Sequence, residues 1–241
     1  MRFLASAFVA TLLVAIPASA EPEVIEFSDL VDPFAIVFDD PYRDMGFQLL
    51  NELKLLIELD EKLSGNTFTN EERTRLTNRR KAAKDMLEIN GYDIDLLLGQ
   101  RWDIAKKRQK ARIATNPVLD GVEVELSGYL IPAGPAADGS FFGYLVPQVG
   151  MCSHLPSPPP NKLVRVKLHD DPREKSLYVP VRISGQLKAE ASDTVIYMTD
   201  GQSRMLSGWI LSAKSVETQQ GLGVDAVKAA SENTVVSEVG H

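Results

Sequence analysis

Cys152, the only cysteine of the sequence, lies two positions before His154, one of only three histidines. A thiolate and an imidazole are typical ligands of zinc and of copper(I). Prolines follow at positions 156 and 158–160, and each fixes φ at about −65° and removes a backbone donor, so we expect an extended, stiff segment. In such a segment the side chains at positions i and i+2 point to the same side. The pair therefore predicts a candidate metal site.

Two ligands do not complete a zinc site, because structural zinc takes four. Three later residues would complete it if the fold brings them close to the pair, namely His169, Asp170 and Asp171. Three thioethers would suit copper instead, namely Met151, Met198 and Met205. The spacing does not select between the two metals.

Two other interpretations of Cys152 stay open. Free cysteine is among the most buried residue types, and a buried histidine can simply satisfy a backbone carbonyl, so the pair can be purely structural. Alternatively Cys152 is a reactive thiol, because an imidazolium at His154 would lower the pKa of the thiol. The chain has no second cysteine to resolve a mixed disulfide, and no motif assigns a catalytic residue, so we expect a protein that is not an enzyme.

The same loop has an alternative use as a docking segment for a protein partner. An extended proline-rich segment loses little conformational entropy when it binds, which suits recognition by a partner. The residues expected to make such a contact are Met151, Pro156, Pro158, Pro159, Pro160 and Asn161.

Residues 1–20 have the pattern of a cleavable export signal. Arg2 precedes an apolar run over residues 3–16, and Pro17 and the small residues 18–20 complete the pattern. The apolar run is shorter than the roughly 20 residues that a membrane span requires. We therefore expect export with cleavage after Ala20, no direct membrane span, and no lipid anchor, since no cysteine follows the cleavage site.

The composition is acidic, with 26 Lys and Arg against 33 Asp and Glu and a net charge of −7. Removal of the signal takes away one arginine and no acidic residue, so the exported chain is more acidic still. An acidic exported protein is a poor candidate for binding nucleic acid. We expect no nucleic-acid partner.

Residues 44–116 are predicted to be helical, after an irregular lead-in over residues 21–43 that prolines punctuate. Leucines recur at three- and four-residue spacing from position 49, as in an amphipathic helix. Thr69 and Glu72 form a capping box at the start of a second helix, and Gly91 ends it. A third helix follows, with Trp102 on its inward face.

The period changes from helical to two after Pro117, which predicts strands over residues 117–216. Gly128 and Gly185 interrupt the alternation, and we expect the strands to bend there. Short bent strands at this spacing indicate a small closed barrel. The predicted fold is therefore α+β, with about three helices packed on an OB-like antiparallel β-barrel and a flexible tail over residues 217–241.

Several stretches of the barrel region resemble one known family. They are Gly121-Val122-Glu123-Val124, Gly128-Tyr129-Leu130-Ile131-Pro132, Phe142-Gly143-Tyr144-Leu145-Val146-Pro147 and Gly150 to Asn161. Together they resemble an uncharacterised family of exported bacterial proteins, the domain of unknown function 3299, whose hallmark is approximately G-x-C-x-H-x-P-x-P-P-x-N-Q. The resemblance covers about residues 90 to 190, and Lys162 stands where the family tends to have Gln.

The resemblance implies a place in the cell and a class of function. Members of this family often accompany ABC-transporter components, and some occur in zinc-responsive gene clusters. The resemblance thus implies a periplasmic accessory to metal homeostasis or to envelope transport, and it does not identify an enzyme. With the Cys152 and His154 pair, it leads us to expect a non-enzymatic accessory protein that binds zinc or another transition metal and is associated with an ABC-type transport system.

Overall fold

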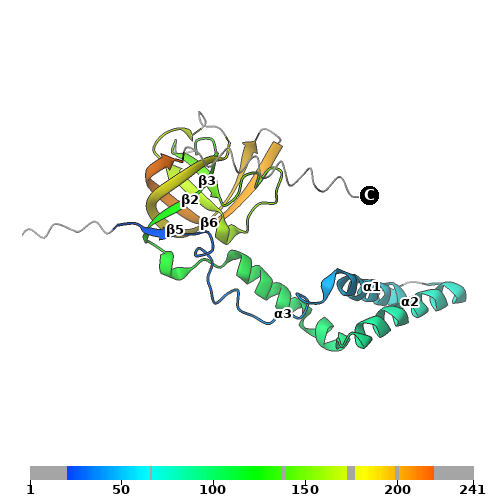
Figure 1. Ribbon diagram of the computed structural model, residues 1–241. Helices are drawn as coiled ribbons and strands as arrows, with labels where there is room; N and C mark the ends of the chain where they lie inside the picture. The colour runs from blue at the N-terminus through cyan, green and yellow to red at the C-terminus, as the bar shows by residue number, and fades with distance from the viewer. Residues whose placement is uncertain (1–20, 66, 137–138, 173–176, 199–200, 220–241) are drawn as a thin grey trace, which may run out of the picture.

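The computed structural model describes residues 21–65, 67–136, 139–172, 177–198 and 201–219. Three helices come first, α1 (Gly46–Gly65), α2 (Asn70–Ile89) and α3 (Ile94–Ile113). The strands are β1 (Glu23–Ile25), β2 (Glu123–Pro132), β3 (Phe141–Val146), β4 (Val164–Leu168), β5 (Val179–Met198) and β6 (Gly201–Thr218). The predicted α+β class is confirmed (Figure 1). The predicted export signal and nearly all of the predicted tail lie outside the described residues.

The helices begin and end where their capping residues predict. The Thr69 side chain accepts the Glu72 backbone N–H at 3.2 Å, and the Glu72 carboxylate accepts the Thr69 N–H at 3.0 Å, so the capping box is confirmed. Gly91 has φ +84°, the left-handed conformation that follows a helix end. Within the described part of the chain, no helix combines the length and the apolarity that crossing a bilayer requires.

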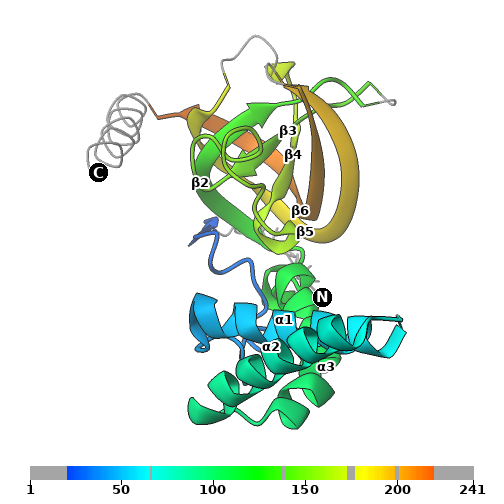
Figure 2. The same cartoon turned by 90° about the vertical axis from the view of Figure 1, so that its right-hand side faces the viewer.

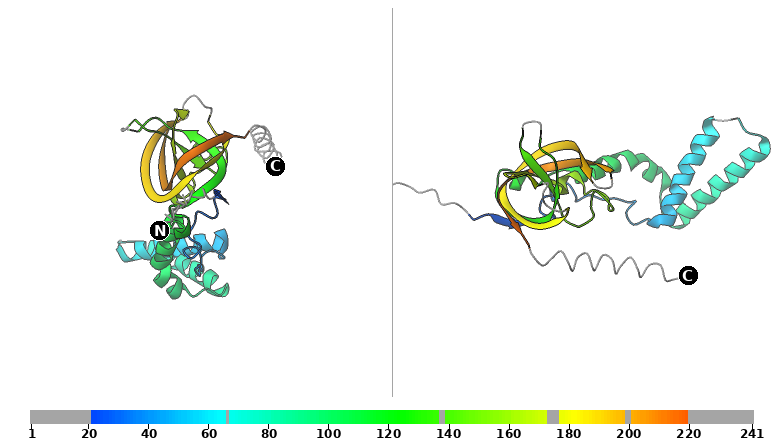
Figure 3. Two further views of the ribbon diagram at one scale, coloured as in Figure 1. Left: turned by 90° about the vertical axis from the view of Figure 1, so that its left-hand side faces the viewer. Right: turned by 90° about the horizontal axis from the view of Figure 1, so that it is seen from above.

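The helices α1 and α2 form a hairpin that extends away from the sheet, as Figures 1 and 3 show. Its small core joins the start of α3 and consists of Leu53, Leu56, Ala83, Leu87, Ile94, Leu97 and Met45. The expectation that Trp102 faces inward is wrong, because its side chain is 66% exposed and Ile104 is buried instead. The helical region contacts the strand region at the C-terminal end of α3, where Asn161 bonds the carbonyls of Ala111 and Ala114.

The six strands form one mixed sheet in which five strands close into a ring. β2 pairs with β3, β3 with β4, β4 with β6, β6 with β5, and β5 again with β2. The antiparallel expectation holds for four of these pairs, whereas β4 and β6 are parallel, as are β1 and β2. The exception follows from the topology, because β6 returns from its hairpin with β5 and runs along β4 in the same direction.

The predicted bend at Gly185 is confirmed. The register between β5 and β6 shifts between Ser184 and Gly185. A Cβ atom at Gly185 would lie 2.1 Å from the Ser212 carbonyl oxygen, closer than real Cβ contacts allow. The bend lets β5 curve with β6 around one side of the ring (Figure 2). β5 is one continuous strand of 20 residues through this bend, longer than the short strands that the sequence predicts.

The ring has two hydrophobic layers. The interior layer includes Val124, Leu126, Leu145, Val166, Ile183, Trp209 and Leu211. An outer layer covers the other face of β3 and consists of Ile131, Ala133, Phe142, Tyr144, Val146, Leu163, Ile196 and Met205. Residues 192–198 pair with residues 201–207 beyond the ring, and we call this extension the hairpin arm. Because the arm contributes Ile196 and Met205, it covers β3 from outside.

Asn161 joins the helices to the ring. Its side chain is buried and donates to the carbonyl oxygens of Ala111 and Ala114, at 2.8 and 2.9 Å, where α3 ends. The backbone carbonyl of Asn161 accepts the indole N–H of Trp209 at 3.2 Å. The same indole N–H also donates to the backbone carbonyl of Leu30 at 3.2 Å. The end of α3, the lead-in and the ring of strands are therefore joined by the side-chain amide of Asn161 and the indole of Trp209.

A second contact fastens the lead-in to α3. Arg108 bonds both carboxylate oxygens of Asp40, at 2.7 and 2.8 Å, and its guanidinium lies 5.6 Å from the centre of the Tyr42 ring. The hydrogen bonds from Arg108 hold the pKa of Asp40 below its ordinary value. Arg108 is therefore a structural cation within the last turns of α3.

Candidate functional site

Cys152 and His154 lie in a tight turn over residues 150–155, which we call the Cys152 turn. The carbonyl oxygen of Gly150 accepts the N–H groups of Ser153, His154 and Leu155 at 3.3, 3.0 and 2.8 Å. The N–H of Cys152 donates to the carbonyl of Leu155 at 3.1 Å. The expectation of an extended path is therefore wrong for these residues, and the argument that places both side chains on one side no longer applies.

Two non-glycine residues of the described chain have positive φ, and both belong to this site. Cys152 has φ +70° and Tyr178, directly before β5, has φ +58°. Non-glycine residues adopt this region at a cost of about 1–2 kcal/mol, so the surrounding contacts must hold them there. The Tyr178 hydroxyl supplies such contacts, since it donates to the Met151 carbonyl at 2.5 Å and lies 2.8 Å from the Ser153 hydroxyl.

The two predicted ligands have different environments. Cys152 is partly buried against the outer hydrophobic layer, and this burial raises the pKa of its thiol, although a hydrogen bond with Ser157 acts in the opposite direction. His154 is exposed on the turn. A raised pKa disfavours the thiolate, which is both the metal ligand and the nucleophile. The environment of Cys152 therefore favours an unreactive thiol.

The proline-rich stretch divides into an exposed and a buried part. Leu155 is 44% exposed, and Pro156 and Ser157 are exposed after it. Pro158 is buried, Pro159 is partly buried with an extended backbone, and Pro160 begins a short 3-10 helix over Pro160–Lys162. Asn161 is buried in the joint with α3. Of the predicted partner-binding residues, Pro156 therefore presents the most surface, whereas Pro158 and Asn161 hold the loop in place.

The predicted metal ligands do not converge in the described part of the chain, where no group of three His, Cys, Asp or Glu residues is placed to hold a metal ion. His169, Asp170 and Asp171 line a separate hollow of about 240 Å³ beside Lys214 on β6, and Cys152 is not part of its wall. The zinc set is thus not assembled. The three thioethers do lie in the same outer layer as Cys152, since Met205 belongs to it and Met151 and Met198 pack against it.

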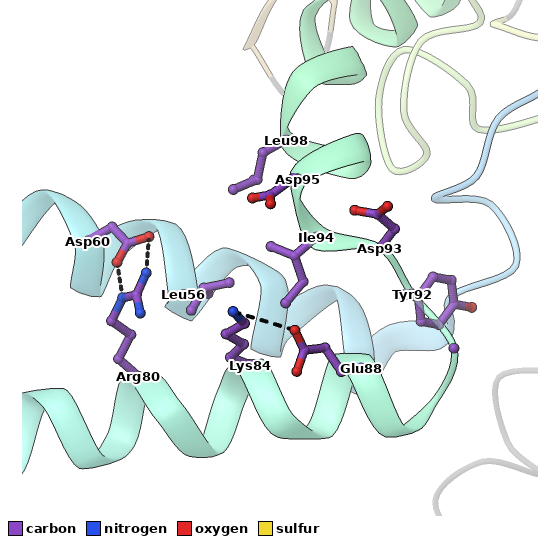
Figure 4. Close-up of a pocket in the computed structure, with 11 residues that line it drawn as sticks. Leu56, Asp60, Arg80, Lys84, Glu88, Tyr92, Asp93, Ile94, Asp95 and Leu98 are labelled. Atoms are coloured by element: carbon purple, nitrogen blue, oxygen red, sulfur yellow. Dashed lines mark hydrogen bonds and ion pairs between the residues drawn. The ribbon is translucent and has the colours of Figure 1, made fainter.

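A larger hollow of about 520 Å³ lies among the helices (Figure 4). Asp60 pairs with Arg80 across α1 and α2, and Lys84 pairs with Glu88 at 3.5 Å. Asp93 on the rim accepts the Leu96 N–H at 3.0 Å and caps α3. Four of the charged side chains that line the hollow are thus paired with one another and Asp93 is engaged by a backbone N–H, so the hollow offers less free binding capacity than its size suggests.

Tyr178 and Ser153 are site residues that the sequence analysis missed. Ser153 lies between the two singled-out residues, and Tyr178 is 26 positions beyond Cys152 in a stretch without a motif. Neither the left-handed backbone nor the contact between the two hydroxyls leaves a periodic signal. A tyrosine directly before a strand was the only available indication.

Comparison with known proteins gives a family and two distant structures. The family model described as "Protein of unknown function (DUF3299)" matches residues 59–218. The crystal structure of a DUF3299 family protein from Pseudomonas aeruginosa PAO1 is similar, with a TM-score of 0.42 and 20% identity over 85% of this chain and 100% of that chain. A small single-stranded DNA-binding protein from Streptomyces coelicolor gives a TM-score of 0.24 and 10% identity over 43% and 99%. No curated protein matches.

Proposed function

Since the chain belongs to the DUF3299 family of proteins of unknown function, we propose that it is a periplasmic accessory protein without enzymatic activity. It docks on an envelope partner through the exposed part of the Cys152 turn and the residues that follow it, Leu155 to Ser157. The proposed partner is a component of an ABC-type transporter, as the family resemblance implies. Export relies on the predicted signal over residues 1–20.

The observation that carries this proposal is a hydrogen-bonded turn whose end is exposed. Gly150 accepts three backbone N–H groups, and the Tyr178 hydroxyl holds the turn from the side. The turn ends on Leu155, which is 44% exposed, followed by the exposed Pro156. A segment that is already ordered gives up little conformational entropy on binding, so its contacts count more fully toward affinity.

The ring that carries this turn is, in our proposal, an OB-like barrel. Support comes from the strand order, because β2, β3 and β4 follow one another as a meander and β5 returns to the side of β2. This is a Greek-key arrangement, and β6 closes it between β4 and β5. A five-stranded Greek-key barrel is the defining architecture of OB-folds.

The docking proposal is tested by co-purification from solubilised envelopes with the mature protein as bait. We expect a transporter component, identified by mass spectrometry, to be retained by the wild type and by the control Val118→Ser, which alters another exposed apolar residue. The double variant Leu155→Ser, Pro156→Ala should lose it. Retention by all three proteins would contradict the docking site.

Metal binding is the second candidate, and one observation supports it. Cys152 shares the outer layer with the thioethers of Met151, Met198 and Met205. Thiolate and thioether sulfurs favour copper(I), while zinc would find here only Cys152 and His154 of the residues that it usually binds. Untagged mature protein equilibrated separately with zinc and with copper(I) should then retain copper. Equal metal content in wild type and Cys152→Ser would rule out this site for either metal.

A further inference from the structure

A cleft of about 600 Å³ lies outside the Cys152 turn, between the hairpin arm and the outer face of β3 and β4. Its wall includes Pro135 after β2, Phe142 of β3, Arg165 of β4 and Thr194 of the arm. Clefts of this size accommodate small organic ligands. Arg165 is the one residue with a full charge among the described residues that line it.

The charge of Arg165 has no carboxylate partner in the described part of the chain. The guanidinium carbon of Arg165 lies 4.3 Å from the centre of the Phe142 ring, and this cation–π contact holds the side chain in place. The contact uses the face of the guanidinium, so the N–H groups at its edge are left to bind an anion. Asp193, next to Thr194 in the arm, is already engaged by Arg204 at 2.8 and 2.5 Å. An acidic protein therefore keeps one uncompensated cation inside a cleft.

We propose that this cleft binds a small organic anion, with a carboxylate or phosphate group on Arg165 and an apolar or aromatic body against Phe142 and Pro135. The planar fork of arginine binds both kinds of oxyanion through two parallel hydrogen bonds. Partial burial of Arg165 strengthens such a contact, because less water competes for the charge. The cleft also repels cationic ligands. This proposal is independent of docking at the Cys152 turn.

A purely structural role for Arg165, as a cover for the Phe142 ring, makes a different prediction. Arg165→Met keeps an apolar cover and removes the charge, so a structural role would leave ligand binding unaffected. Arg182→Met is the matched control, because Arg182 also lies on a strand but is paired with Glu125 at 3.5 Å. Thermal unfolding of each variant shows whether the fold is retained.

The test is titration of the mature protein with phenyl phosphate and with phenylacetate, followed by NMR chemical shifts and calorimetry. The neutral phenylacetamide and inorganic phosphate report the apolar body and the anion separately. We expect at least one of the two aromatic anions to shift resonances of residues 134–136 and 194–197, and the stronger of the two identifies the anion. Arg165→Met should weaken binding about tenfold or more, while Arg182→Met should not.

Three results would overturn the proposal. The first is that neither aromatic anion binds at millimolar concentration. The second is that Arg165→Met remains folded and binds the anion as tightly as the wild type does. The third is that phenylacetamide binds as tightly as the two anions. Each result would return Arg165 to the role of a cover for the outer hydrophobic layer.

Discussion

The two halves of the segment Gly150–Asn161 differ in what they contact. The first half, up to Ser157, forms a turn that is held by its own backbone and by Tyr178, and its end is exposed. The second half enters the protein, where Asn161 binds the end of α3 and the Trp209 indole. One motif thus contains residues that are exposed to solvent and residues that connect α3 to the strands.

The comparison shows that residues in one motif need not share one function. Asn161 and Pro156 both entered the sequence analysis as residues that contact a partner. Only Pro156 remains available for this, because the Asn161 side chain is 1% exposed. Substitutions in the second half should therefore change stability, whereas substitutions at the exposed end of the first half should change binding.

The largest expected effect is that of Asn161→Ala. It removes two hydrogen bonds at the end of α3 and leaves a void at a position that is 1% exposed, which costs about 2–3 kcal/mol, although the Ala114 carbonyl keeps the Asp32 N–H at 3.2 Å. Urea unfolding of the mature protein measures the change. Pro156→Ala serves as the control from the exposed half and should stay within about 0.5 kcal/mol of the wild type. Similar losses in both variants would remove the distinction between the halves.

The next largest effect should come from Cys152→Val. A β-branched side chain fits the left-handed region poorly, so at φ +70° we expect a loss of about 1–2 kcal/mol. Cys152→Ser keeps an unbranched side chain and should lose less than Cys152→Val in the same unfolding experiment. If the two variants unfold at the same urea concentration, the backbone of the turn is not constrained as described.

Tyr178→Phe should have a smaller effect on stability, of about 1 kcal/mol, because the lost hydroxyl serves partly exposed groups. Its clearer signature is local. Amide hydrogen exchange should become faster at Ser153, His154 and Leu155, since the turn loses its lateral contact. Tyr197→Phe is the control, as Tyr197 is 80% exposed. Unchanged exchange in Tyr178→Phe would contradict the assigned role.

The smallest expected effect is the pH dependence due to Cys152. Burial raises the pKa of its thiol from the ordinary value of 9.0, so the folded state disfavours the thiolate. This contribution to stability is complete below the pKa of the unfolded thiol and disappears as the pH rises through the folded pKa. The wild type should therefore lose stability relative to Cys152→Ser above about pH 9. A loss on acidification instead would contradict a buried thiol.

The sequence predicted those parts of the fold that local chemistry determines. Thr69 and Glu72 predict the start of α2, and Gly185 predicts the bend of β5. Trp102 was misplaced because helical periodicity identifies a face but not whether another element covers it. The parallel pairing of β4 with β6 depends on the path of the whole chain and leaves no local signal.

The candidate site was harder to predict for the same reason. Proline content correctly indicated an extended backbone at Pro159, but the left-handed backbone of Cys152 depends on a turn closed by Gly150 and on Tyr178, which directly precedes β5. The burial of Asn161 depends on where α3 ends. Contacts between distant segments decide these features, and residue type alone does not reveal them.

The most direct test of the two-part segment is site-specific photo-crosslinking in intact cells, with a photoreactive residue introduced at a single position. At position 155 we predict a crosslinked product that contains an envelope transporter component. At position 118, where Val118 is 77% exposed against 44% for Leu155, we predict no such product. The same product from both positions, or no product from position 155, would contradict the proposal that this turn is a docking surface.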